Sequence, residues 1–89
     1  MTDHAEPLVL DPAGVVVSDP DIAGGEPIFR GTRVPVATLF EHLEEGDSLQ
    51  DFLDGFPTVE RGDVMTLLRE AHSLVVGQEL RRPAATAAE

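Results

Sequence analysis

Residues 34–56 read VPVATLFEHLEEGDSLQDFLDGF, and this stretch decides the fold because it predicts two short helices in succession. Apolar side chains recur in each half at positions i, i+3, i+4 and i+7, which places them on one face of a helix. The two stripes are Val36, Leu39, Phe40 and Leu43, and then Leu49, Phe52, Leu53 and Phe56. Each predicted helix therefore has one apolar face to bury.

Start and stop signals bound both helices. Pro35 suits the first helical position, and Gly46 is a natural stop. Ser48 is predicted to cap the second helix, with Asp51 three residues later in the position of a capping box. The Gly55–Pro57 turn then ends this helix.

A third and longer helix is predicted from about residue 60 to about residue 80. Its stripe consists of Val64, Leu67, Leu68, Ala71, Leu74 and Val75. Glu60 stands at the cap position but is a poor N-cap, so Thr58 is an alternative that lengthens the helix by two residues. Three helices with a tight turn between the last two match the outline of a helix-turn-helix unit, although many three-helix bundles share it and bind no DNA.

Two short β-favouring runs precede the helices, Leu8–Leu10 and Val15–Val17, with Asp11–Gly14 between them. Pro at the second position and Gly at the fourth position of that turn favour type I, so a β-hairpin is predicted. Residues 18–25 are turn-rich and predict a loop, and residues 28–30 predict one further short strand.

The expected fold class is therefore α+β, mostly α: an N-terminal β-hairpin and short strand, followed by a three-helix helix-turn-helix-like unit of the winged-helix or homeodomain-like kind. Residues 8–80 are expected to form a single domain, with residues 1–7 and 81–89 as flexible tails. Short exposed strands and a small core favour a homodimer, with strands that pair across the interface.

Charge and composition limit the function classes. The 89 residues carry 17 acidic and six basic side chains, all six of them arginine, for a net charge of −11. This charge excludes a uniformly basic nucleic-acid-binding surface, so the chain either meets a basic protein partner or gathers its arginines on one face. Without cysteine, disulfides and thiolate zinc sites are excluded. No run approaches the roughly 20 apolar residues of a membrane span, and a cytoplasmic protein is expected.

Catalysis is not expected. One cluster resembles a metal or acid–base site, namely His42 with Glu41, Glu44 and Glu45, and no second histidine stands at ligand spacing. A histidine satisfied at the surface is the simpler interpretation of this cluster. The sequence therefore predicts no catalytic residue, no metal site and no cofactor.

Residues 19–36 read DPDIAGGEPIFRGTRVPV, and a related pattern continues in Glu44–Ser48, Phe56–Pro57 and Asp63–Val64. Over residues 17–76 the chain resembles the bacterial "domain of unknown function 433" family. The resemblance implies an antitoxin of the VapB kind with a helix-turn-helix-like domain. It also implies a partner, a PIN-like ribonuclease toxin encoded beside the antitoxin, and repression of the chain's own operon.

Gly31, Thr32 and Arg33 predict a structural turn motif within this segment. Gly31 supplies a backbone angle that other residues resist, and Thr32 can hydrogen-bond the turn. Arg33 is expected either to contact phosphate or to brace the fold by pairing with a carboxylate. The candidate carboxylates are Asp19, Asp21 and Glu26.

Four side chains are the candidates for DNA contact. Arg30, in the short strand, is a better candidate for a surface contact than Arg33. On the third helix, Arg61, Thr66 and Arg69 are expected near a major groove, and the alternative is a solvated helix face.

Arg81 and Arg82 follow the third helix and suit the negative end of its dipole. They are also candidates for entering the toxin's acidic active site, because an arginine fork pairs well with clustered carboxylates. The main hypothesis is an antitoxin that neutralises a PIN-like ribonuclease toxin and binds operator DNA together with it. The alternatives are a stand-alone DNA-binding transcriptional regulator and a protein-interaction adaptor with no nucleic-acid role.

Overall fold

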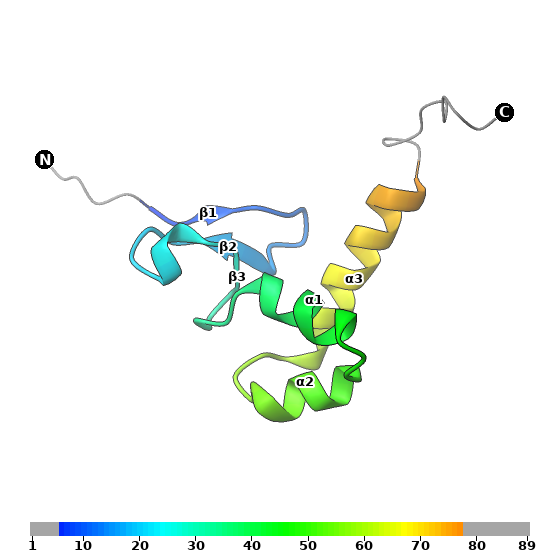
Figure 1. Cartoon of the computed structure of the whole chain (residues 1–89). Helices are drawn as coiled ribbons and strands as arrows, with labels where there is room; N and C mark the ends of the chain where they lie inside the picture. The colour runs from blue at the N-terminus through cyan, green and yellow to red at the C-terminus, as the bar shows by residue number, and fades with distance from the viewer. Residues whose placement is uncertain (1–5, 78–89) are drawn as a thin grey trace, which may run out of the picture.

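The computed structural model describes residues 6–77, in which a three-stranded antiparallel sheet precedes three helices (Figure 1). The strands are β1 (Leu8–Val9), β2 (Val16–Ser18) and β3 (Ile28–Phe29), and the helices are α1 (Val36–Glu44), α2 (Leu49–Gly55) and α3 (Arg61–Val76). The predicted α+β class and the order of its elements are confirmed. Residues 1–5 and 78–89, which include most of the two predicted tails, lie outside the described residues.

The sheet has the order β1-β2-β3, and Val9 pairs with Val17 while Val16 pairs with Phe29. The hairpin turn is closed twice by Asp11. Its backbone carbonyl accepts from the Gly14 N–H (3.1 Å), and its carboxylate accepts from the Val16 N–H (2.8 Å). The predicted hairpin is thus present, and its first strand is one residue shorter than expected.

Between β2 and β3 the chain makes a short 3-10 turn, Ala23–Gly25, within the predicted loop. The hydroxyl of Ser18 donates to the Gly25 carbonyl at 2.6 Å and fixes this turn against the end of β2.

The ends of α1 and α2 follow the local signals in the sequence. Pro35 is the N-cap of α1 rather than its first helical residue, because its ψ of 141° is extended. Gly46 ends the helix with a φ of 94°, a backbone angle that favours glycine. The capping box of α2 is complete: the Asp51 N–H donates to the Ser48 hydroxyl at 3.0 Å, and the Ser48 N–H donates to the Asp51 carboxylate at 3.1 Å.

Helix α3 starts at Arg61 with Glu60 as its N-cap, and the Glu60 side chain makes no capping hydrogen bond. The alternative cap at Thr58 is therefore wrong. Gly77 follows the helix, and its N–H donates to the Ser73 carbonyl at 2.7 Å.

A buried cluster in the core joins Phe29 of the sheet to the three helices, while Val16 and Ile28 of the sheet are buried as well. Phe29 of β3 packs against Phe52 of α2 with ring centroids 6.2 Å apart, and both side chains are fully buried. His42 of α1 meets the rings of Phe52 and Phe56 edge-on, and its Nδ1 lies 2.9 Å from a carboxylate oxygen of Asp47. The buried cluster consists of Phe29, Val34, Leu39, Phe52, Val59 and Val64.

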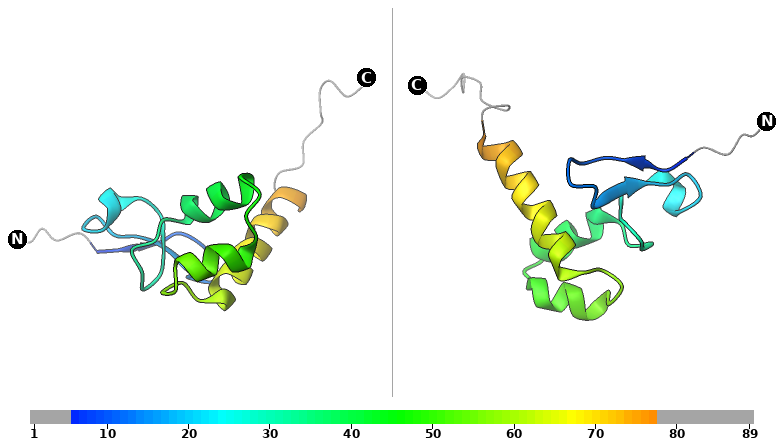
Figure 2. Two further views of the ribbon diagram at one scale, coloured as in Figure 1. Left: turned by 60° about the horizontal axis from the view of Figure 1, so that its bottom comes forward. Right: turned by 180° about the vertical axis from the view of Figure 1, so that it is seen from behind.

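The apolar stripe predicted on α3 reaches this core only in its first half. Val64 is fully buried and Leu67 is half-buried, whereas Leu74 and Val75 are 52% and 68% exposed. Figures 1 and 2 show why: the C-terminal half of α3 extends beyond the other two helices. The prediction that Leu74 and Val75 belong to the core is therefore wrong.

Ser48→Ala removes the acceptor of the Asp51 N–H and is expected to lower the free energy of unfolding by about 1 kcal/mol. Thr58→Ala is the matched control, because Thr58 is exposed and its hydroxyl has no hydrogen-bond partner within residues 6–77. The control is expected to change stability by less than about 0.5 kcal/mol. Urea unfolding followed by circular dichroism measures both, and equal losses would contradict the assigned cap.

Candidate functional site

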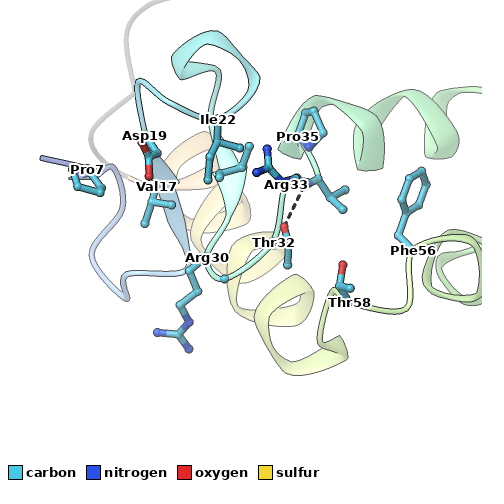
Figure 3. Close-up of a pocket in the computed structure, with 13 residues that line it drawn as sticks. Pro7, Val17, Asp19, Ile22, Arg30, Thr32, Arg33, Pro35, Phe56 and Thr58 are labelled. Carbon is cyan, nitrogen blue, oxygen red and sulfur yellow. Dashed lines mark hydrogen bonds between the residues drawn. The ribbon is translucent and has the colours of Figure 1, made fainter. Parts of the chain in front are cut away.

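The motif-bearing segment from Asp19 to Val36 forms most of one surface groove, called here the signature groove (Figure 3). Its volume is about 710 Å³, and its opposite side is the α2–α3 connection with Phe56 and Thr58. Apolar groups dominate the lining, with the polar side chains Asp19, Arg30, Thr32, Arg33 and Thr58 among them. A mostly apolar lining with a few polar groups is the usual composition of a binding groove.

A tight turn between β3 and α1 builds the centre of this groove. Gly31 has a φ of 74°, in the left-handed region that side chains resist. The Thr32 hydroxyl donates to the Phe29 carbonyl at 2.8 Å and accepts from the Val34 N–H at 2.9 Å. The Phe29 N–H in turn donates to the Val34 carbonyl at 3.0 Å, so Thr32 sits inside a closed turn.

The two arginines beside this turn have different environments. Arg30 donates through Nη2 to Asp63 Oδ1 of α3 at 3.1 Å, and its Nη1 reaches the Gly14 carbonyl at 3.4 Å. The Asp63 side chain is only 13% exposed, so this pair is half-shielded from water. Arg30 therefore connects β3, the hairpin turn and α3.

Arg33 is exposed, and no carboxylate lies within 4.0 Å of its guanidinium in the described part of the chain. The expected pairing with Asp19, Asp21 or Glu26 is therefore absent there. Figure 3 shows Arg30 and Arg33 leaving the turn in different directions, because they lie on opposite sides of Gly31. Bracing thus falls to Arg30, and Arg33 keeps a guanidinium available at the signature groove.

A second polar contact joins the hairpin turn to α3 further along the helix. The Ala13 N–H donates to Glu70 Oε2 at 3.0 Å. The other carboxyl oxygens of the two residues, Asp11 Oδ2 and Glu70 Oε1, are buried and accept no hydrogen bond from a protein N–H or O–H group in the described residues. Glu70 is thus half-buried against the hairpin.

The pKa values of these two carboxyls move apart. A hydrogen bond with Asp11 raises the pKa of Glu70, burial raises it further, and the Ala13 N–H only partly opposes this. Burial raises the pKa of Asp11, but the hydrogen bond from Glu70 and those from backbone N–H groups of residues 14–16 outweigh burial, and the pKa ends below its ordinary value. The two pKa values move in opposite directions because the two carboxyl groups interact directly through a hydrogen bond.

A second groove, the hairpin–helix groove, lies between the hairpin turn, Phe40 of α1 and the outer half of α3, and also measures about 710 Å³. Its apolar walls are Leu10 and Pro12 on one side and Leu67 and Leu74 on the other. Large apolar side chains remain exposed on the hairpin and on α3. On the hairpin they are Leu8, Val9 and Leu10, and on α3 they are Leu74, Val75 and Val76. These six side chains leave apolar surface exposed at both the hairpin and the outer half of α3.

Residues 16–71 match the family described as "Protein of unknown function (DUF433)". The chain belongs to this family. The 46 aligned residues of an uncharacterized protein, y4eO of Sinorhizobium fredii, are 41% identical and cover 52% of this chain but 21% of that protein. No solved structure matches the chain.

The DUF433 segment contains nearly all of the signature groove, from Val17 to Thr58. Strand β1 and residues 72–76 of α3 lie outside it. Within residues 6–77, the large exposed apolar side chains are therefore carried on parts that flank the family segment.

The four residues predicted to contact DNA have different environments in the structure. Arg30 pairs with Asp63, and Arg61 donates to the Gln50 side chain of α2. Thr66 is half-buried, and Arg69 is exposed at the hairpin–helix groove. Arg81 and Arg82 lie outside the described residues.

Two further properties concern residues 6–77 alone. No group of three or more histidine or carboxylate side chains there is arranged to hold a metal ion. The helices of this part are too short or too polar to span a bilayer.

Arg30→Ala is expected to lower the free energy of unfolding by about 1–2 kcal/mol, because it leaves the Asp63 carboxylate partly buried without its partner. Arg33→Ala is the matched control from the same turn and is expected to change stability by less than about 0.5 kcal/mol. Chemical denaturation of both variants measures the difference. A larger loss for Arg33→Ala would show that the bracing arginine has been misassigned.

Proposed function

We propose that this chain is the antitoxin of a type II toxin–antitoxin system, which binds and neutralises a PIN-like ribonuclease toxin and performs no reaction itself. The observation that carries the proposal is the unpartnered end of α3. Leu74, Val75 and Val76 are 52–68% exposed in succession on a helix that extends beyond its own core. A stable free protein gains nothing from such a surface, whereas a partner chain buries it at about 25 cal/mol per Å² of apolar area.

The charge of the chain supports a basic protein partner. A net charge of −11 attracts a nuclease whose surface handles RNA, and electrostatic attraction of this kind speeds association. The same charge repels nucleic acid unless cationic groups are segregated or the toxin supplies them.

Two sets of arginines have proposed roles toward the toxin. Arg33 is proposed to contact the toxin through its exposed guanidinium at the signature groove. Arg81 and Arg82 follow the exposed end of α3 in the sequence, and one of them is proposed to enter the acidic active site of the ribonuclease.

Operon repression is the second part of the proposal, with α1–α3 as a helix-turn-helix-like unit and a homodimer as the DNA-binding form. The seven-residue α2, a short connection and the sixteen-residue α3 have the proportions of a supporting and a recognition helix. Because Arg30 and Arg61 already have polar partners on the protein, we propose that operator DNA is bound by the complex with toxin. A stand-alone transcriptional regulator and an adaptor without a nucleic-acid role remain the alternatives.

The toxin interface is tested by co-expression with the product of the neighbouring gene. That product is expected to arrest growth alone and to be harmless with this chain. Val75→Asp is expected to weaken the complex at least about tenfold, because it buries an unpaired charge, and Ala37→Asp on the exposed side of α1 is the matched control. Growth rescue and calorimetric Kd values measure both variants.

In the same assay, Arg81→Ala combined with Arg82→Ala is expected to leave complex formation measurable while it weakens inhibition of the ribonuclease. A neighbouring product that is not toxic, or that forms no complex with this chain, would overturn the antitoxin proposal. Full inhibition by the double variant would remove only the role of these two arginines.

DNA binding is tested by gel shift on the chain's own upstream region, with and without toxin. Arg69→Ala, which removes an exposed cation, is expected to weaken binding of the complex several-fold and to lower its salt dependence by one phosphate contact. No shift in either state would leave the adaptor interpretation.

A further inference from the structure

The hairpin is held against α3 at two polar points that lie far apart in the sequence. One is Arg30, between the Gly14 carbonyl and Asp63. The other is the hydrogen bond that the Ala13 N–H donates to the carboxyl group of Glu70, a residue 57 positions later in the sequence. Figures 1 and 2 show the closed end of the hairpin directed toward α3, so these contacts decide whether the hairpin stays against the helix.

The second point needs a proton to be satisfied. Asp11 Oδ1 accepts from the Val16 N–H, and Glu70 Oε2 accepts from the Ala13 N–H. The two remaining oxygens, Asp11 Oδ2 and Glu70 Oε1, are buried without a protein partner. A proton on Glu70 Oε1, donated to Asp11 Oδ2, satisfies both atoms at once, whereas two ionised carboxylates leave both unsatisfied and repel each other.

The groups around the pair do not replace that proton. From α3, Arg69 lines the same groove, and in residues 6–77 it forms no ion pair with either carboxyl. From the turn that follows β3, Arg30 is committed to Asp63 and the Gly14 carbonyl. The residue that α1 contributes is Phe40, which carries no charge.

We propose that Asp11 and Glu70 form a proton-operated latch, which holds the hairpin turn on α3 while one proton is shared and releases it when that proton is lost. Release separates Leu10 and Pro12 from Leu67 and Leu74, the two walls of the hairpin–helix groove. The latch therefore sets the shape of an apolar surface on this chain, whatever partner that surface takes.

The pH window follows from the directions of the two pKa values. The pKa of Glu70 is raised above its ordinary 4.5, so its contribution is complete at low pH and is lost as pH rises through the raised value. The pKa of Asp11 is lowered below its ordinary 3.8, so its contribution is lost only as pH falls through that lower value. The latch is closed between the lowered pKa of Asp11 and the raised pKa of Glu70, and it opens as pH rises above the latter.

Glu70→Gln is the decisive variant, because its amide donates to Asp11 and accepts from the Ala13 N–H at every pH. The experiment is amide hydrogen exchange by NMR on the full chain, corrected for the intrinsic pH dependence of exchange. In the wild type, protection of the Ala13 amide is expected to fall roughly three- to tenfold between about pH 5 and about pH 8, the range of one net hydrogen bond. In Glu70→Gln it is expected to change less than about twofold.

Glu44→Gln removes an exposed carboxylate on α1 and is the control for the change in net charge, so it is expected to keep the wild-type pH dependence. Protection of the Asp51 amide in the α2 capping box reports that each variant is folded. A wild type whose Ala13 protection does not change with pH, or a Glu70→Gln variant that keeps the wild-type dependence, would overturn the latch. A carboxyl ¹³C titration in which Glu70 loses its proton at or below its ordinary pKa would do the same.

Discussion

Phe29 and the next residue, Arg30, connect the β-sheet to the helices. Phe29 ends β3 and enters the helical core against Phe52, while Arg30, the first residue after the strand, reaches the hairpin turn and Asp63 of α3. The two residues of β3 and the residue that follows them thereby contact the sheet, the core and the longest helix. The turn at Gly31 and Thr32 then returns the chain to α1, and the placement of all three helices depends on that return.

This arrangement gives the family motif a physical meaning. Gly31 and Thr32 shape the turn, and Arg30 braces it against α3, so these parts of the motif encode the fold. Arg33 is the exception, because its exposed guanidinium has no carboxylate within 4.0 Å in the part of the chain that the structure describes. Within the motif it is the side chain whose identity the fold explains least, which fits a contact with another molecule.

An excess of acidic groups is managed inside the fold in two different ways. Asp63 is neutralised by an arginine, although arginines are scarce in this chain. For Asp11 and Glu70 we propose instead a shared proton, which needs no cation but makes the contact depend on pH. Apolar side chains of β1 and of the end of α3 also remain exposed. Both features fit a small chain that completes its surface by binding a partner.

The sequence by itself determined what short-range chemistry controls: the hairpin turn, the capping box of α2, the order of strands and helices, and the family. Those signals act within a few residues and are readable as spacing and residue type. Tertiary structure alone decided that Arg30 braces the fold instead of Arg33, that Glu70 faces the hairpin, and that Leu74 and Val75 lie outside the core. The first two outcomes depend on contacts across long sequence separations, 33 positions for Arg30 with Asp63 and 57 positions for Ala13 with Glu70. The third depends on where a long helix passes the edge of a small core. Helical periodicity encodes neither.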